Sequence, residues 1–261
     1  MFIKFDLFKY NLLYIIKMDI ATKIIKTREN LTTILDELDF DTTTIQKLSE
    51  VEIKKMLEKK VDVSEISSLE SGSCHFTIKH KFLDSFKLNI LYVSLDPESS
   101  RLTKSFSNKI INLYLNEIVE KNSSCLLILN EKITETIQKI MDDINIKLDS
   151  SREDIEQLKG EMKSKKYFVN TNYFRRCWLL NLDHITVNLK NHRLVSPHKP
   201  IKDEEEIKKI LEKCNCKKFN LPVISRHDIM SNYTLASPGD IMVIQRTSKT
   251  TGDYPFYRLV K

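Results

Sequence analysis

The chain has 261 residues, of which 41% are hydrophobic and 30% are charged. This balance excludes an intrinsically disordered chain, and the length accommodates one large domain or two modest ones. Only four residues are glycine and no glycine-rich nucleotide-binding pattern occurs, which excludes enzymes built on such phosphate loops. The net charge is +6, and residues 192–261 alone carry +5. The charge by itself fits contact with an acidic partner and an ordinary surface equally well.

The number of cysteines is odd, and no two of them have the spacing of a zinc-binding pair. Cys214 and Cys216 are separated by one residue, and no second ligand pair follows at zinc spacing. The six histidines are scattered along the chain. We therefore expect reduced, mostly buried thiols in an intracellular protein, with no metal and no cofactor. The five cysteines are Cys74, Cys125, Cys177, Cys214 and Cys216.

The first 17 residues resemble a weak signal or anchor. Their apolar stretch, Tyr10–Ile16, is far too short to span a membrane, and no small-residue cleavage site follows it. We expect residues 1–17 to be a non-structural extension, with Met18 as the alternative start to Met1, and no membrane association.

Apolar residues at helical spacing predict a helix over residues 19–38, capped by Asp19. Ser49 and Glu52 form a capping-box pattern that predicts a second helix. Alternation over residues 74–79 then predicts a half-buried strand in which His75 faces solvent, and residues 86–92 repeat the pattern as its neighbour.

A helix is expected over residues 101–120, followed by a continuous apolar strand at 125–129 and a helix at 132–143. Residues 149–166 are highly charged and predict an exposed helix or linker. The segment Phe174–Leu189, which contains Trp178 and Ile185–Val187, predicts a further strand that leads to a domain boundary near residue 190.

Five of the six prolines lie in the last 70 residues, which is typical of a compact, turn-rich module. Acidic residues from Asp203 predict the start of a helix, and Asp228 predicts the cap of a shorter one. Strands at Ile241–Arg246 and Tyr254–Val260 are expected to pair antiparallel around a turn that ends at Gly252. We expect domains at 18–187 and 188–261.

Sixteen residues of the tail stand in an order and spacing that resembles the assembly domain of the fifth subunit shared by eukaryotic nuclear RNA polymerases. The archaeal counterpart of that subunit belongs to the same family. The resemblance covers about 70 residues. The matching residues are His192, Leu194, Val195, Pro197, His198, Leu221, Pro222, Asp228, Gly239, Asp240, Arg246, Ser248, Gly252, Tyr254, Tyr257 and Arg258. Three departures affect loop geometry: Ile229 replaces a proline, Leu235 replaces a glycine, and Pro197 is displaced by one position.

The resemblance implies a non-catalytic subunit of a DNA-directed RNA polymerase with an α/β (α+β) fold. The eukaryotic subunit begins with an α/β jaw domain of nuclease-like topology, whose element order matches residues 19–143, whereas the archaeal counterpart lacks this domain. The small C-terminal assembly domain, with a mixed sheet and short helices, would dock on the largest subunit at the lower jaw and support downstream DNA entry. No small-molecule substrate is implied. The composition, rich in Ile, Lys and Asn, suggests an AT-rich genome, so nucleus and virion or viral factory both remain open as locations.

The alternative is a free-standing nucleic-acid-binding or nuclease-like protein. Glu52 and Lys54 match one piece of a nuclease motif, but they lie on a predicted helix with no acidic strand before it, which argues against a nuclease site. Arg246 and Arg258 suit either a phosphate or a carboxylate, and we favour a protein partner. The aromatic residues beside Arg258 suit base stacking or, as we favour, a small β core.

Overall fold

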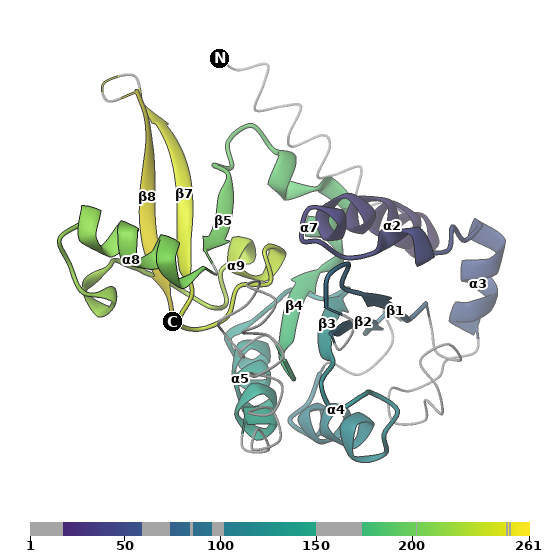
Figure 1. The fold of residues 1–261 in the computed structure, drawn as a ribbon. Coiled ribbons are helices and arrows are strands. Elements are labelled where there is room, and N and C mark those ends of the chain that lie inside the picture. Colours follow the sequence, from purple (N-terminus) through teal and green to yellow (C-terminus); the bar gives the residue numbers. More distant parts are fainter. Residues whose placement is uncertain are drawn as a thin grey trace.

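The described part of the chain forms two four-stranded sheets that lie side by side, each with its own helices (Figure 1). We call residues 18–187 the N-terminal region and residues 188–261 the C-terminal region. The computed structural model describes residues 18–58, 74–83, 86–95, 102–149, 174–201, 203–248, 250 and 252–261. The expected extension at 1–17 and most of the charged stretch at 149–166 lie outside these described residues.

The sheet of the N-terminal region has the strand order β1-β2-β3-β4, in which β1 runs antiparallel to β2 and the other pairs are parallel. Every residue of β3 is buried, as its continuous apolar run predicts for a strand covered on both faces. The strands are β1 Phe76–Lys79, β2 Lys87–Val93, β3 Ser124–Leu129 and β4 Cys177–Asn181.

Helices cover both faces of this sheet (Figure 1). Alternate strand residues supply the two cores: Ile90 and Ile128 pack with α2 and α7, whereas Leu91 and Leu127 pack with α4 and α5. A further helix, α3, inserts the fully buried Ile53 beside α2. The helices are α2 Ile20–Asp36, α3 Glu50–Glu58, α4 Ser105–Leu115, α5 Glu135–Asp149 and α7 Leu182–Val187, with a 3-10 helix at Thr42–Thr44.

Two local expectations for this region are wrong, and a third is confirmed in part. The strand expected within Phe174–Leu189 is β4, which contains Trp178, whereas Ile185–Val187 follows it in α7. Asn181 caps that helix by accepting a hydrogen bond from Asp183 N at 2.8 Å, and Ile185 packs against α2. Asp19 stands at the N-cap of α2, but its side chain makes no capping hydrogen bond. His75 is buried, because its Nδ1 accepts a hydrogen bond from Tyr92 N at 3.1 Å.

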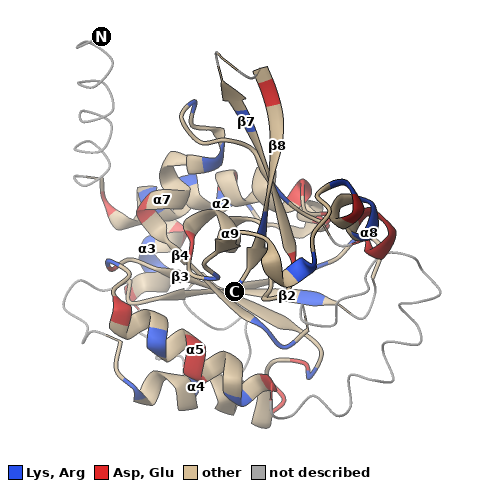
Figure 2. Ribbon diagram, turned by 90° about the vertical axis from the view of Figure 1, so that its left-hand side faces the viewer, with Lys and Arg blue, Asp and Glu red and all other residues tan. Residues whose placement is uncertain are grey.

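The sheet of the C-terminal region has the order β5-β7-β8-β6. The hairpin of β7 and β8 is its longest part and projects from the body of the molecule (Figures 1 and 2). The strands are β5 His198–Ile201, β6 Val223–Ile224, β7 Ile241–Ser248 and β8 Gly252–Val260. The helices are α8 Glu204–Lys213 and α9 Ile229–Tyr233, with 3-10 helices at Leu189–Asn191 and Lys218–Asn220.

Local sequence signals explain the helices and the turn of this region. Asp203 caps α8 by accepting a hydrogen bond from Glu205 N at 2.9 Å, and Asp228 caps α9 through Met230 N at 2.8 Å. Gly252 has a φ of 69°, the left-handed conformation expected at a turn glycine. Within the described part of the chain, no helix is long and apolar enough to cross a lipid bilayer.

Candidate assembly interface

One face of the β7–β8 hairpin gathers three of the sequence-predicted partner residues. The register pairs Arg246 with Tyr254 and Met242 with Arg258, and directly opposed residues share a face of a sheet. His198 on β5 is paired with Ile244 and so lies on the same face. The structure therefore brings His198, Arg246, Tyr254 and Arg258 together.

Phe256 lies between the two arginines on this face. The Arg246 Cζ atom is 4.7 Å from the centroid of the Phe256 ring, and the Arg258 Cζ atom is 5.0 Å from it. These are cation–π contacts, which hold both guanidiniums over the ring. Arg258 also donates from Nη1 to the Val223 carbonyl oxygen at 3.2 Å. We call Arg246, Phe256 and Arg258 the arginine face.

The arginine face has no neutralising carboxylate within the described residues. Neither guanidinium has an ion pair there, Arg246 is exposed, and the neighbouring Tyr254 is 37% exposed. Asp228 belongs to the α9 cap, and Asp253 is paired with Thr247, which places it on the opposite face of the hairpin. The surface is therefore cationic, aromatic and preorganised, which is the composition of an interface anchor.

His198 borders the arginine face as a half-buried, neutral ring. Its Nδ1 donates to the Ser196 carbonyl oxygen at 2.6 Å when that nitrogen carries the proton. Burial lowers the pKa of His198, and the positive charges of Arg246 and Arg258 lower it further, against the opposing effects of the Ser196 hydrogen bond and Asp228. This residue adds no third charge near neutral pH.

The remaining motif residues hold the module together or lie in its loops. Asp240 accepts a hydrogen bond from Ser237 N at 2.8 Å, and Gly239 N donates to the Val260 carbonyl oxygen at 2.9 Å. Tyr257 lies on the opposite face, where burial beside α8 raises its pKa. Leu221 is buried in the same α8-side core. His192, Leu194, Val195 and Pro197 form a connecting loop, Pro222 accepts Leu259 N, and Ser248 Oγ accepts Thr250 N at 3.2 Å.

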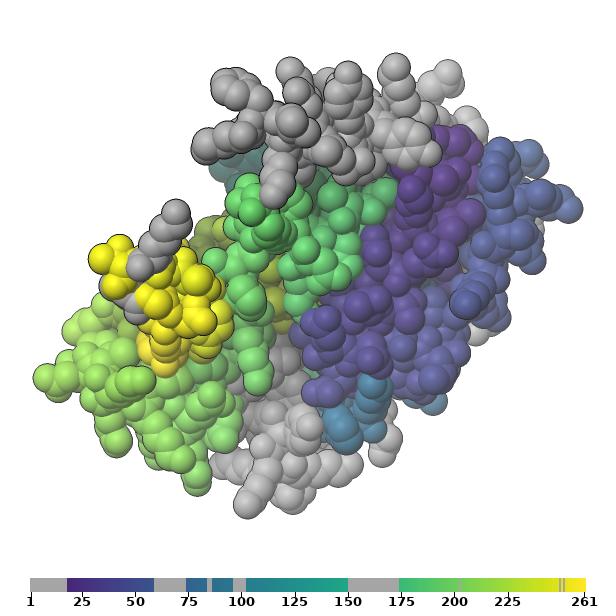
Figure 3. Space-filling model, turned by 90° about the horizontal axis from the view of Figure 1, so that it is seen from above, coloured from purple at the N-terminus to yellow at the C-terminus, as the bar shows by residue number. Residues whose placement is uncertain are grey.

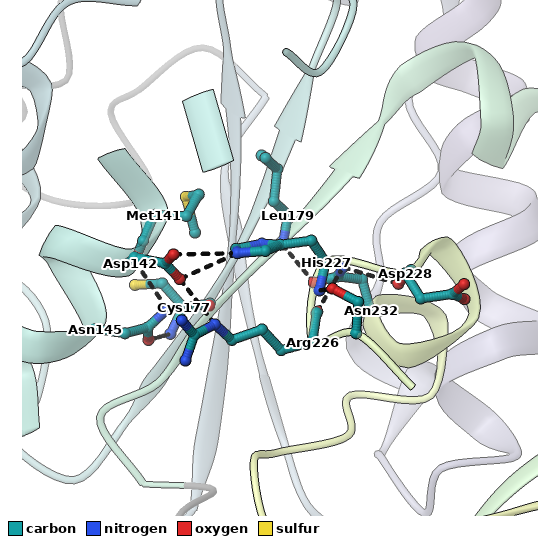
Figure 4. A network of polar contacts seen from close by, with 10 residues as sticks. Met141, Asp142, Asn145, Cys177, Leu179, Arg226, His227, Asp228 and Asn232 are labelled. Atoms are coloured by element: carbon teal, nitrogen blue, oxygen red, sulfur yellow. Dashed lines mark hydrogen bonds and ion pairs between the residues drawn. The ribbon is translucent and has the colours of Figure 1, made fainter. Parts of the chain in front are cut away.

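Sequence reasoning missed the seam between the two sheets. Among the described residues, β4 is an edge strand, so its outer backbone groups have no strand partner there. Asn145 on α5 replaces that partner, because its side chain accepts Cys177 N at 3.0 Å and donates to the Cys177 carbonyl oxygen at 3.1 Å. Asn232 on α9 accepts Leu179 N at 3.1 Å. Two carboxamides, one from each region, thus complete the edge of the sheet (Figure 4).

Charged and apolar contacts reinforce this seam. Asp142 binds Arg226 Nε at 2.9 Å and His227 Nε2 at 3.1 Å, with both partners reaching α5 from the C-terminal region (Figure 4). Trp178 Nε1 donates to the Ala236 carbonyl oxygen at 2.9 Å. Tyr233 at the end of α9 and Leu235 just after it are buried in the larger core of the N-terminal region.

The nuclease-like pair is part of a helix start. Glu52 accepts hydrogen bonds from Ser49 N at 2.8 Å and Ser49 Oγ at 2.7 Å, which completes the predicted capping box and lowers the pKa of Glu52. Lys54 is paired with Glu50 at 2.5 Å. Both residues lie on α3, away from the sheet where nuclease carboxylates would be expected, and the described residues include no His, Cys, Asp and Glu cluster suited to a metal ion.

The structure defines a class of protein: a small β module with an exposed cationic and aromatic face, attached to a larger α/β region. Comparison with known proteins identifies the β module. The family model described as RNA polymerase Rpb5, C-terminal domain, matches residues 187–260. DNA-directed RNA polymerase subunit Rpo5 of Methanococcus maripaludis is 39% identical over 74 residues, which cover 28% of this chain and 94% of the relative. The subunit Rpo5 of Pyrococcus abyssi is 42% identical over 73 residues, 28% of this chain and 88% of the relative.

The chain belongs to the Rpb5/Rpo5 family of RNA polymerase subunits. It is a non-catalytic subunit of a DNA-directed RNA polymerase, its partners are other subunits of that enzyme, and its location is intracellular. The sequence-based prediction of this family is confirmed.

Proposed function

We propose that the C-terminal region, as an assembly domain, docks this protein on the largest polymerase subunit. The observation that carries the proposal is the extent of the match: the two relatives named above align over 94% and 88% of their own length with 28% of this chain. A polymerase subunit can therefore consist of little more than this module. The arginine face and the sixteen motif residues are the candidate partner-binding set. On this proposal, His198, Arg246, Tyr254 and Arg258 touch the largest subunit directly, and the other motif residues support their placement.

The N-terminal region is, on this proposal, a jaw-like domain placed beside downstream DNA at the lower jaw. Its helix-first α/β order, with α2 and α3 before the strand pair, supports this assignment. The seam at Asn145, Asp142 and Asn232 would transmit the docked position of the C-terminal region to the jaw (Figure 4). The protein would work in the nucleus, or in a virion or viral factory if a virus encodes it, and fractionation of source cells distinguishes these locations.

Co-purification tests the proposal. The tagged full chain is isolated from source cells under gentle conditions, and we expect the large catalytic polymerase chains to elute with it. When the complex is then cross-linked, this chain should be joined mainly to the largest subunit. A free-standing nucleic-acid-binding protein would instead elute alone and bind DNA with a salt-dependent affinity of its own. That second result would contradict the docking role.

A further inference from the structure

The sheet face that carries the arginine face is only half covered. Its inner half is closed by Ala236, which packs with Met242, Ile244 and Val260 in one small core. Phe256 packs at the margin of that core and stays half-buried, and beyond it the hairpin projects outward (Figure 1). In the view from above, the yellow hairpin lies at the margin of the molecule (Figure 3). The apolar surface thus continues from the core onto a face that nothing in the described part of the chain covers.

A partner would meet this hairpin on its face rather than along its edge. Leu259 N bonds outward to the Pro222 carbonyl oxygen, so alternate residues of β8, including position 255, direct their backbone groups away from β7. Pro255 has no N–H to offer at that edge, which blunts it against the addition of another strand. Pro200 interrupts the opposite edge strand, β5, in the same way.

We propose that the arginine face receives an acidic segment of another polymerase chain, with its carboxylates paired to the guanidiniums of Arg246 and Arg258. The inference rests on the proposed docking function and names the chemistry of the partner. Arginine binds a carboxylate through two parallel hydrogen bonds, and stacking on Phe256 fixes both guanidiniums in advance.

A protein carboxylate fits this face better than a nucleic acid does. Binding to nucleic acid draws on a stripe of several cations that neutralise successive phosphates. The arginine face supplies only two cations, both on one aromatic ring, and the adjoining His198 is neutral. The acidic start of α8 lies on the other side of the sheet, where the negative charge of Glu206 adds to the effect of burial in raising the pKa of Tyr257. It therefore does not compete for these arginines.

Charge reversal in the full chain tests the proposal. We expect R246E/R258E to reduce the amount of co-purified polymerase chains at least tenfold. R246K/R258K should reduce it less because the charges remain, and T247E should behave as the wild type. Thr247 is the matched control because it is exposed, adjacent in sequence and on the opposite face. The single variant R246E repeats the test without disturbing the Arg258 bond to Val223.

A zero-length carbodiimide then reports the partner group directly. In R246K the introduced amine should form an amide with an aspartate or glutamate of another polymerase chain, whereas T247K should form none there. Wild-type association of R246E, together with no cross-link from R246K, would overturn the acidic-segment proposal while leaving the docking function intact. Loss of binding to a duplex DNA oligonucleotide without loss of polymerase chains would overturn it in favour of phosphate. Failure of the wild type itself to associate would overturn both.

Discussion

The two regions of this molecule divide stability and recognition unequally. The N-terminal region buries two large cores, one on each face of its sheet, but lies almost entirely outside the family match. The C-terminal region has two small cores of a few residues each and carries that match. Tyr233 of α9 and Leu235 after it are buried in the larger core of the N-terminal region. The comparison teaches that the region recognisable as a polymerase subunit has the smaller cores, and that its contacts with the N-terminal region hold it in place.

The largest expected effect breaks the seam between the regions. Trp178 is 3% exposed and donates to the Ala236 carbonyl oxygen. Trp178→Ala should lower the free energy of unfolding by about 3–5 kcal/mol, the usual cost of truncating a buried large aromatic side chain. Denaturant unfolding followed by circular dichroism measures this. The control Trp178→Phe keeps most of the burial, and a loss below about 1 kcal/mol for the alanine variant would show that the seam is loose.

Acid should weaken the N-terminal region through His75. Burial lowers the pKa of this histidine from 6.5 to about 4, so the unfolded chain binds a proton in that interval that the folded chain refuses. Stability is then lost as pH falls from about 6.5 toward 4, by on the order of 3 kcal/mol. His75→Gln keeps an acceptor for Tyr92 N and should flatten this part of the curve. Identical pH profiles for the two proteins would contradict the assignment.

At Leu235, strain in the backbone of the C-terminal region is opposed by burial of the side chain in the N-terminal region. Its φ is 49°, where the family pattern has a glycine, yet its side chain is 4% exposed in the core of the N-terminal region. Relief of the left-handed strain is worth about 1–2 kcal/mol, and loss of a buried leucine costs about 2–5 kcal/mol. Leu235→Gly should therefore destabilise the full chain by roughly 2 kcal/mol in thermal or denaturant unfolding.

The matched control for that change is Asn215→Gly. Asn215 also has a left-handed backbone, with a φ of 46° after α8, but its side chain is exposed. Here we expect no loss of stability, since no buried group is removed. Stabilisation of both variants would mean that Leu235 contributes nothing to the seam.

The smallest effect concerns the capping box of α3. Ser49→Ala should cost about 1 kcal/mol of stability, because it removes the side chain that pairs with Glu52. Association with polymerase chains should stay unchanged, and no nuclease activity should appear or vanish with Mg²⁺ present. DNA cleavage by the wild type that is lost in Glu52→Ala would support the nuclease hypothesis.

Local signals in the sequence predict local structure well. The aspartates that cap α8 and α9, the capping box of α3 and the glycine of the hairpin turn all act within a few residues, so their positions are readable. The strand predicted within Phe174–Leu189 is β4, but the Ile-Thr-Val run that follows it is helical. β-Branched residues favour strands, whereas the Asn181 cap and packing on α2 select a helix there.

The seam could not be predicted for a different reason. Asn145 meets Cys177 across 32 positions, and Asn232 meets Leu179 across 53. An asparagine in a helix carries no sign that it completes a distant sheet edge. The arginine face was partly predictable, because alternation places Arg246 with Ile244 and Arg258 with Phe256, but the stacking of both arginines on one ring required the register of the hairpin.

The most direct test of the account is the affinity of the full chain for polymerase depleted of this subunit, measured for Arg246→Ala/Arg258→Ala beside a control, Lys208→Ala/Lys209→Ala on exposed α8 positions. We predict that the arginine variant binds at least about 30-fold more weakly, equivalent to roughly 2 kcal/mol, and that the control binds as the wild type does. The free energy of unfolding of the arginine variant should fall by only about 1 kcal/mol, because Arg258 also loses its hydrogen bond to Val223. Normal binding by the arginine variant would show that the dock lies elsewhere. Simple unfolding of it would show that these arginines maintain the fold and do not recognise a partner.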